Sequence, residues 1–420
     1  MCFKVFKNTA LLFVFIAISC GSNTKNDLSN NEPQKQAKDN EHIVVGTNRT
    51  ELYLPLLQGR RIGIVANQTS IVTHSLQKVD HPEIIEETNY HLVDYLNSNK
   101  SVNVVKVFSP EHGFRGKADA GELVKDGKDT KTGLPILSLH GKHKKPTKQQ
   151  LKDLDIMIFD IQDVGVRFYT YISTLHYVME ACAENNIPLL ILDRPNPNGN
   201  YIDGPVLETK HRSFLGMHPV PLVHGMTIGE YAKMINGEAW LSDGVTCDIT
   251  IIEIKNYTHK STYSIPIRPS PNLPNDQSIT LYPSLGLFEG TNINAGRGSE
   301  FQFQRYGAPF LDENYYKFSY TPTANFGSKY PKHENTICYG VDLSETKVDR
   351  SFTLSYIMDA YKNATDKSKV FNTSNFTTHA GTEKLQKQIQ AGLTEAEIKL
   401  SWQEDLKTYK KMRSQYMIYD

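Results

Sequence analysis

Short apolar runs that each end in polar residues recur along the first half of this chain. Four of them are rich in Val, Ile, Leu and Phe and lie at 61–66, 102–108, 155–160 and 187–192. Continuous apolar runs of this length are typical of buried strands in a parallel sheet. Amphipathic stretches separate the runs, so the pattern predicts a mostly parallel sheet wrapped by helices.

The stretches between and after these runs predict the helices, at 84–97, 147–154, 170–184 and 227–236. In the third helix, one face carries the apolar residues Ile172, Leu175, Val178, Met179 and Cys182, which we expect to be core. Thr227 followed by Glu230 predicts a capping box at the start of the fourth. A last helix is predicted at 394–412, and the tail at 416–419 is apolar enough to dock.

The segment 265–274 contains too many prolines for a helix or a central strand, so we place a domain boundary near it. A glycine-rich loop at 290–299 and mixed sequence follow. The predicted fold class is therefore α/β. A Rossmann-like, mostly parallel sheet flanked by helices occupies 43–265, and a smaller α+β C-terminal domain occupies 266–420.

The first forty residues have the layout of a bacterial secretion signal. Two lysines precede an apolar run at 10–18, and the small and apolar residues that follow lead to Cys20, as in a lipobox. We expect a lipoprotein signal peptide over 1–19, a lipid on Cys20 and a polar, flexible tether over 20–42. The body would then be periplasmic and lipid-anchored to a bacterial membrane. An ordinary cleaved signal with an incidental cysteine is the alternative.

Charge and cysteine content argue against a nucleic-acid partner, a disulfide framework and a zinc site. Lys plus Arg and Asp plus Glu both number 46, so no large basic field favours nucleic acid. Cys182, Cys247 and Cys338 are too widely spaced for a disulfide framework or a zinc site, and we expect at most one bonded pair. The chain has 22 Tyr against 2 Trp, and tyrosine-rich clefts suit sugars.

Polar side chains follow each of the four apolar runs: Asn67, Glu111 with His112, Gln162 with Asp163, and Asp193 with Arg194. The carboxyl ends of parallel strands border the ligand crevice of an open α/β sheet, so we expect these groups to converge. The first run is not followed by a glycine-rich phosphate loop, so we expect no nucleotide cofactor.

Two carboxylates in such a crevice suit glycoside cleavage, because one can hold a proton while another stays ionised. We predict Glu111 as the acid, its backbone fixed by Pro110 and Gly113. Asp163 is the predicted partner, to activate water or orient the substrate. The same loop offers further substrate contacts at Gln162, Arg167 and Tyr169.

Structural alternatives exist for these assignments. Asp163 could instead cap a loop, and Asp193 could belong to a structural ion pair. A metal site would need separate strands to assemble the histidines and acids, since His112, His140, His143 and His224 show no ligand spacing, and we expect no metal. A serine hydrolase is not supported, because no Gly-x-Ser-x-Gly elbow follows any run.

Longer motifs around these residues resemble one family. The stretches are 67–70, 108–116, 119–122, 159–171, 192–197, 224–227, 269–274, 296–298 and 307–309. They are similar to the exo-β-N-acetylmuramidase family typified by NamZ, over about residues 44–419. One departure is 299–303, where the family usually continues with Thr and a Pro-Phe pair.

The resemblance implies a Rossmann-like domain with a smaller C-terminal domain, and an active site in the cleft. It also implies removal of N-acetylmuramic acid from non-reducing ends of peptidoglycan fragments. The family's glutamate in the Pro-Glu-His-Gly motif falls on Glu111. The lactyl carboxylate of this sugar calls for a cation. The candidates are Arg115, Arg167, Arg194 and Arg297, with Arg167 the best placed, although each is alternatively a structural ion pair.

The sequence thus predicts an exo-acting glycoside hydrolase for terminal β-linked N-acetylmuramic acid, with catalytic Glu111 and Asp163. The predicted substrate-binding residues are Asn67, His112, Arg115, Gln162, Arg167, Tyr169, Asp193, Arg194, His224 and Arg297. The 2-acetamido group also permits substrate-assisted cleavage. A muropeptide-binding lipoprotein without catalysis and a cell-wall esterase or amidase are the alternative functions.

Overall fold

The computed structural model describes residues 42–77, 85–111, 113–116, 126–141 and 143–420. Within it, His42–Asp420 form one compact unit. The predicted signal peptide, Cys20, nearly all of the tether, His112 and the motif at 119–122 lie outside the described residues. Among the residues described, no helix is both long and apolar enough to cross a membrane.

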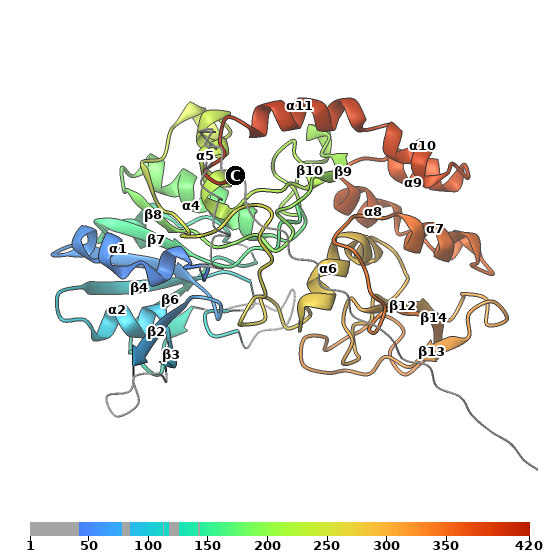
Figure 1. The fold of residues 1–420 in the computed structure, drawn as a ribbon, viewed down its shortest axis with the longest axis horizontal. Coiled ribbons are helices and arrows are strands. Elements are labelled where there is room, and N and C mark those ends of the chain that lie inside the picture. The colour runs from blue at the N-terminus through green and yellow to red at the C-terminus, as the bar shows by residue number, and fades with distance from the viewer. Residues whose placement is uncertain (1–41, 78–84, 112, 117–125, 142) are drawn as a thin grey trace, which may run out of the picture. The chain divides into compact units, whose positions relative to one another are not determined.

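A seven-stranded sheet forms the centre of the N-terminal region, in the order β11-β8-β7-β1-β4-β6-β5 (Figure 1). Its strands are β1 (Arg61–Ala66), β4 (Asn103–Ser109), β5 (Gly127–Lys128), β6 (Pro135–Ser138), β7 (Ile156–Asp160), β8 (Leu189–Leu192) and β11 (Ile249–Ile252). Every pairing is parallel except that of β5 with β6. The four apolar runs are the neighbouring strands β8, β7, β1 and β4, so the predicted mostly parallel sheet is confirmed.

Helices cover both faces of this sheet. They are α1 (Thr50–Leu57), α2 (Leu92–Ser98), α3 (Lys148–Leu151), α4 (Tyr171–Glu184) and α5 (Ile228–Gly237). Met157 and Phe159 of β7 pack in the cluster that holds α4 and α5, while the alternate Ile156 and Ile158 pack with α1 and α2. Both faces of a central strand are therefore buried, which explains its continuous apolar sequence.

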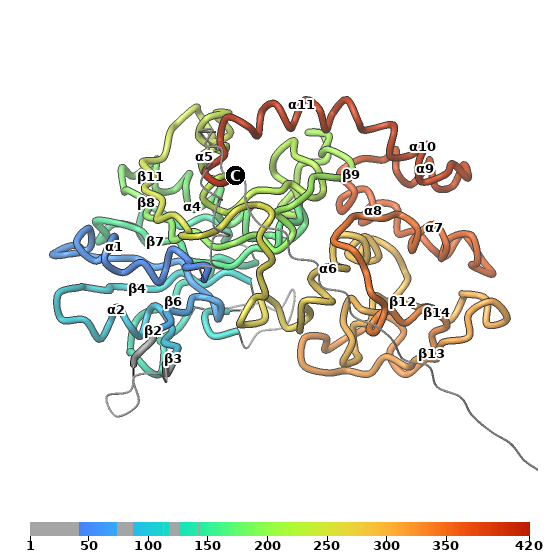
Figure 2. Tube along the Cα trace, in the orientation of Figure 1, coloured from blue at the N-terminus to red at the C-terminus, as the bar shows by residue number. Residues whose placement is uncertain are grey.

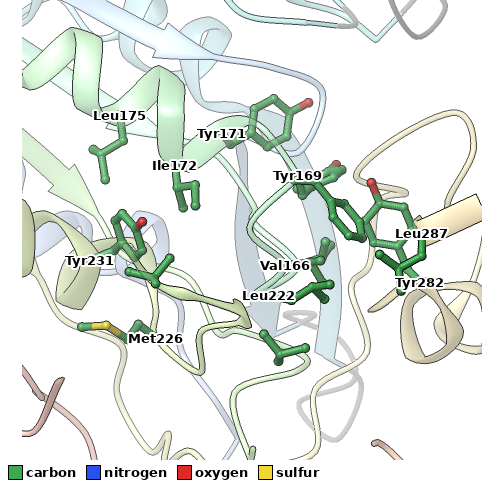
Figure 3. Close-up of a cluster of buried hydrophobic side chains, with 14 of the residues drawn as sticks. Val166, Tyr169, Tyr171, Ile172, Leu175, Leu222, Met226, Tyr231, Tyr282 and Leu287 are labelled. Atoms are coloured by element: carbon green, nitrogen blue, oxygen red, sulfur yellow. The ribbon is translucent and has the colours of Figure 1, made fainter. Parts of the chain in front are cut away.

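The helices predicted at 147–154, 170–184 and 227–236 are confirmed as α3, α4 and α5, although α3 is shorter than predicted. The predicted apolar face of α4 is buried, and Figure 3 shows Ile172 and Leu175 on the side that faces Tyr231. Thr227 caps α5, and its capping box with Glu230 is present. Local side-chain chemistry was sufficient to locate these helices.

The helix predicted at 84–97 is wrong over its first half. Only α2 is helical there, because Ile85–His91 form β3, which pairs antiparallel with β2 (Ile71–Gln77). The side chains of Thr73 and Asn89 also bond across this hairpin, at 2.8 Å. Pairing with a strand that precedes it in the chain thus overrode the local helical pattern.

The C-terminal region contains a three-stranded antiparallel sheet in the order β12-β14-β13 and a set of helices. The strands are β12 (Arg305–Ala308), β13 (Phe318–Tyr320) and β14 (Cys338–Asp342). The helices are α6 (Asp276–Leu285), α7 (Ser355–Lys362), α8 (Thr373–Ala380), α9 (Lys384–Gln390), α10 (Glu395–Leu400) and α11 (Gln403–Arg413). The predicted α+β character is confirmed. The domain boundary at 265–266 stays a prediction, although the proline-rich segment before α6 has no helix or strand, as expected.

The long helix predicted at 394–412 is in fact two helices, α10 and α11, which break at Trp402. Trp402 is buried, and its indole N–H donates to Asp203 of the small β9 (Asp203–Val206) and β10 (Pro221–Val223) pair at 3.2 Å. The turn between the two helices is thus anchored to β9. The chain then returns along α11 to the α5 side, where Tyr409 donates to the carbonyl of His224 at 2.7 Å (Figure 2).

The predicted docking of the tail is confirmed. Tyr419 is buried, and its hydroxyl donates to Asp193 just past β8 at 2.8 Å. The N–H groups of Ile418 and Tyr419 both donate to Glu230 of α5, at 3.0 and 3.2 Å. The end of the chain therefore joins a strand end to a helix. Elsewhere in the core, Cys182, Cys247 and Cys338 are buried free thiols.

Candidate active site

A pocket of about 140 Å³ lies past the carboxyl ends of the central strands. It is lined by Glu111, Phe168, Tyr169, Thr170, Tyr171, Leu215, Ser270, Asn272, Leu273, Tyr282, Glu289, Arg297, Phe303 and His379. The chain passes from β1 to β4 on one side and later to β7 on the other, so this edge is the topological switch point. The sheet supplies one wall of the pocket and the C-terminal region supplies the other.

Glu111 stands two residues past β4 and is partly exposed. The hydroxyl of Thr170, at the start of α4, donates to Glu111 Oε2 at 3.1 Å. The turn that carries it is closed by the N–H of Gly113, which donates to the Pro110 carbonyl at 3.1 Å with a φ of 79° at Gly113. A left-handed φ favours glycine, so the predicted role of this residue in fixing the turn is supported by its geometry.

Asn67, predicted to bind substrate, does not line the pocket but bonds a side chain that does. It is fully buried at the end of β1, and its amide donates to the Tyr171 hydroxyl at 2.8 Å. Its amide oxygen accepts from the N–H and the hydroxyl of Thr69. Asn67 therefore orients the pocket-lining ring of Tyr171.

Glu289 is the second carboxylate of the pocket, and sequence reasoning missed it. It lies in the 3₁₀ turn η4 (Gly286–Gly290), where its Oε2 accepts from Arg297 at 2.9 Å. Burial raises the pKa of Glu289, but the positive charges of Arg297 and Lys332 outweigh burial and hold it below its usual value. Glu289 is therefore ionised at neutral pH. It follows no strand, and its one sequence signal is the adjoining glycine-rich loop.

Arg297 is the predicted cation that lines the pocket. Gly296 and Gly298 on either side have φ values of 76° and 78°, and a Cβ at Gly298 would stand 2.6 Å from Pro331. Arg297 also donates to the carbonyl of Gly327 at 3.2 Å. The two glycines thus shape the backbone on either side of Arg297, and Glu289 and the Gly327 carbonyl hold its guanidinium at the pocket.

His379 reaches the pocket from α8, and sequence reasoning missed it too. Its Nδ1 lies 2.8 Å from the carbonyl of Asn375, which can only accept, so Nδ1 carries a proton. Burial lowers the pKa of His379, and the charges of Lys332 and Arg167 add to this effect. The neutral ring therefore carries its lone pair on Nε2.

Aromatic rings form much of the pocket wall. Tyr169 meets Tyr171 edge to face with centroids 5.0 Å apart, and Tyr282 meets Phe303 in the same way at 4.8 Å. Figure 3 shows Tyr169 beside Tyr282, with Leu287 packed behind. The Tyr169 hydroxyl donates to the Pro269 carbonyl at 2.7 Å, which ties the sheet region to the proline-rich segment. Such a wall offers aromatic surface to the C–H groups of a sugar.

Asp163 and His224, by contrast, are not among the lining residues. The carboxylate of Asp163 is buried and accepts the N–H of Gly165 at 2.7 Å, as a loop cap would. His224 Nε2 lies 3.6 Å from the same oxygen, and its Nδ1 accepts from the N–H of Met226. Gln162 is also buried and donates to two backbone carbonyls. These three side chains thus support the loop after β7.

Asp193 and Arg194 lie in the buried network past β8. Asp193 accepts from Thr227, from the N–H of Gly229 and from Tyr419, and its burial raises its pKa to about 6. Arg194 forms a two-pronged pair with Asp160, at 2.6 and 3.0 Å.

The remaining predicted cations also lie in structural contacts. Arg167 has no exposed surface, and its guanidinium donates to four backbone carbonyls, one in β9, one directly before β10 and two at the end of α8. Arg115 bonds to Asp94 of α2 and to Asp129. Neither residue lines the pocket. Of the predicted set, the structure therefore brings Glu111, Tyr169 and Arg297 together at the pocket.

A larger pocket of about 260 Å³ lies at the opposite edge, near the amino ends of β7 and β8. Its described lining contains a single carboxylate, Asp248, so it lacks the paired acids of the other pocket. Among the described residues, no three His, Cys, Asp or Glu side chains are grouped as a metal site would require.

Comparison with known proteins agrees with this architecture. Two family models, "Exo-beta-N-acetylmuramidase NamZ, N-terminal" and "Exo-beta-N-acetylmuramidase NamZ, C-terminal", match residues 62–277 and 280–419. The peptidoglycan beta-N-acetylmuramidase NamZ of Bacillus subtilis is 39% identical over 385 residues, which cover 87% of this chain and 89% of that protein.

Two crystal structures of DUF1343 family proteins from Bacteroides fragilis share the fold. One superposes with a TM-score of 0.79 at 43% identity, and the other with 0.73 at 26% identity. Each alignment covers 90% of this chain and 99% of the other. Together with the two family models, these similarities identify the chain as a member of the NamZ family of exo-β-N-acetylmuramidases, which are glycosidases.

Proposed function

We propose that this protein is an exo-acting glycoside hydrolase that removes terminal, non-reducing, β-linked N-acetylmuramic acid from peptidoglycan fragments. The observation that carries the proposal is a pair of carboxylates that line one pocket. Glu111 comes from the N-terminal region and Glu289 from the C-terminal region. Paired carboxylates beside a scissile bond are what glycoside cleavage requires. The family to which the chain belongs supplies the substrate class.

In this proposal Glu111 is the general acid that protonates the leaving oxygen. Thr170 holds one of its oxygens and so orients the carboxyl group. Glu289, kept ionised by Arg297 and Lys332, supports the positive charge that develops on the sugar or activates the attacking water. Glu289 takes the role that the sequence suggested for Asp163, because Glu289 lines the pocket and Asp163 does not.

Arg297 is the cation that we assign to the lactyl carboxylate of the substrate. It lines the pocket, whereas Arg167, Arg194 and Arg115 are committed to carbonyls or to buried acids. A guanidinium bonds a carboxylate with charge-assisted hydrogen bonds. Its partner Glu289 would share it with the ligand.

The size of the pocket supports removal of one sugar at a time. At about 140 Å³ it has about half the smallest volume of pockets for drug-sized ligands, roughly 300 Å³. A pocket of this volume has no room for several sugar rings, so the rest of a chain would lie outside it.

A synthetic methyl β-glycoside of N-acetylmuramic acid tests the proposal. Wild-type protein should release the sugar, and NMR of the released anomer gives the stereochemistry. Glu111→Gln should lower turnover roughly 10²- to 10⁴-fold with binding retained. Glu404→Gln on α11, 89% exposed, is the matched control and should be fully active. A binding lipoprotein would bind the glycoside without cleaving it, and an esterase or amidase would leave the linkage intact.

The lipid anchor is part of the proposal. The lipobox-like sequence that ends at Cys20 supports a lipoprotein held on a bacterial membrane with its body in the periplasm, where peptidoglycan fragments arise. Mass spectrometry of the mature protein should find acyl chains on Cys20. Mature protein without acyl chains would refute the lipid anchor but would not affect the proposed enzymatic activity.

A further inference from the structure

The single-sugar pocket leaves the rest of a substrate chain to be bound at its rim, an inference that rests on the proposed function. Next to the C-terminal wall of the pocket lies a tight turn at 325–328. Two backbone hydrogen bonds between Asn325 and Ser328, at 3.0 and 3.1 Å, close it. Such closure fixes the backbone of the two central residues, Phe326 and Gly327.

This turn is fixed directly to the pocket wall. The carbonyl of Gly327 accepts from Asn272 at 2.7 Å and from Arg297 at 3.2 Å, and both donors line the pocket. Gly327 has a φ of 98°, and a Cβ there would stand 2.9 Å from Pro271. Asn325 also donates to the carbonyl of Ser299 at 3.0 Å. The turn is therefore in a set position next to Arg297.

One large aromatic side chain, Phe326, belongs to this turn, and a second, Tyr330, follows two residues after it. Phe326 is 58% exposed and Tyr330 is 90% exposed. Single exposed aromatics are common on protein surfaces, so exposure alone carries no function. Phe326 differs because its neighbour Gly327 bonds two pocket residues, so its ring stands one residue from a contact with the pocket wall.

We propose that Phe326, with Tyr330 close to it in the chain, forms a stacking platform for the sugar that follows the one in the pocket. The partner is the saccharide chain on the leaving-group side of the scissile bond. An aromatic face packs against the C–H face of a pyranose without needing charge, and a ring on a rigid turn loses little freedom on binding. The platform would therefore set the preference for chains over single glycosides.

The test compares two substrates, the methyl β-glycoside and a four-sugar peptidoglycan-derived chain with a terminal N-acetylmuramic acid. Phe326→Ala should raise KM for the chain roughly threefold to tenfold and change KM for the methyl glycoside less than about twofold. Phe326→Trp, which keeps an aromatic ring, should leave the KM for the chain near the wild-type value. Tyr315→Ala is the matched control, because Tyr315 is 55% exposed but bonds Asp359 of α7, and it should affect neither substrate.

An equal rise in KM for both substrates would mean that Phe326 supports the pocket itself. An unchanged KM for both would mean that the chain binds elsewhere. Either result overturns the platform. Binding of the chain to Glu111→Gln, with and without Phe326→Ala, tests the platform without turnover. Weaker binding by the double variant supports it, and equal binding refutes it. If that difference is seen while wild-type protein cleaves neither substrate, the proposed function fails and the platform stands.

Discussion

Acidic residues near the carboxyl edge of the sheet fall into two regions with different surroundings. At the pocket, Glu111 is partly exposed and holds the hydroxyl of Thr170. Behind it, Asp160 and Asp193 have no exposed surface and bond to several fixed donors. A carboxylate that is buried among fixed donors stabilises the fold, whereas one that keeps a face in a pocket is available to a substrate.

The buried region also joins distant parts of the chain. Asp160 ends β7 and holds Arg194 past β8, while Ser70 past β1 donates to the Asp160 carbonyl. Asp193 bonds α5 and the penultimate residue, Tyr419. The edge of the sheet is thus rigid behind the pocket. Preorganisation of this kind keeps catalytic groups in place.

The largest expected difference between the two regions is in how a substitution changes the free energy of unfolding. Arg194→Met leaves the buried Asp160 without its partner, which should cost about 3–5 kcal/mol of unfolding free energy. Glu111→Gln should leave the unfolding free energy within about 0.5 kcal/mol of wild type, although turnover falls. Urea unfolding of both variants measures the two effects. Equal destabilisation by both substitutions would show that the pocket carboxylate stabilises the fold as much as the buried ion pair does.

The docked tail offers a smaller test in the buried region. Tyr419→Phe removes the hydroxyl that donates to Asp193 and accepts from the N–H of Ile254 at 2.9 Å, and should cost about 1–3 kcal/mol. Tyr416→Phe is the control, because Tyr416 bonds Glu238 near the surface and should cost less than about 1 kcal/mol. Thermal unfolding compares the two. A larger loss for Tyr416→Phe would show that the tail is not held through Asp193.

The smallest expected effect concerns pH and a buried histidine pair. His176 Nδ1 lies 2.9 Å from His218 Nε2, and His218 Nδ1 lies 3.0 Å from the Tyr231 hydroxyl. Burial lowers the pKa of His176 to about 4 and that of His218 well below its usual value, although Glu180 beside His176 acts in the opposite direction.

Both rings are therefore neutral in the fold and take up protons on unfolding below pH about 6.5. Their stabilisation is complete above that pH and is lost as the pH falls towards about 4 for His176. The loss due to His176 should be under about 1 kcal/mol between pH 7 and 6. Asp193, whose pKa is raised to about 6, acts in the opposite sense, since its protonation in the fold adds stability as the pH falls.

His176→Asn separates the two contributions, because Asp193 is unchanged in that variant. Urea unfolding at several pH values should give a shallower fall in stability below pH about 6.5 than in wild-type protein. An unchanged slope would show that His176 is not held neutral by its burial.

Much of the fold could be predicted from the sequence because its cues are local. The strand bounds 61–66 and the capped helix after Thr227 follow from apolar runs and from a capping box, each within a few residues. The predictions at 84–97 and 394–412 failed where a distant partner decided the structure. In the first case that partner is the strand β2, and in the second it is the core site of Trp402.

The candidate site divides in the same way. Glu111 was predictable, because it follows an apolar strand and stands in a family motif. Arg167 looked equally well placed in the sequence, but its guanidinium is enclosed by carbonyls from α8 and from the segments of β9 and β10. Chain proximity to a strand end does not reveal whether a side chain points into a pocket or into the core.

The sequence by itself determined the parallel sheet, most of its helices, the family and the position of Glu111, since each is encoded in short patterns and motifs. The tertiary structure alone decided that Glu289 and His379 complete the pocket wall, that Arg297 is the one of the four candidate arginines that lines it, and that Asp163 and Asp193 are buried outside it. Burial and hydrogen-bond partners depend on how separate segments pack, such as the contact of Asp193 with Thr227 and Tyr419, and the local pattern around a strand end does not contain that information. The chemistry of a carboxylate therefore follows from its place in the fold as much as from its place in the chain.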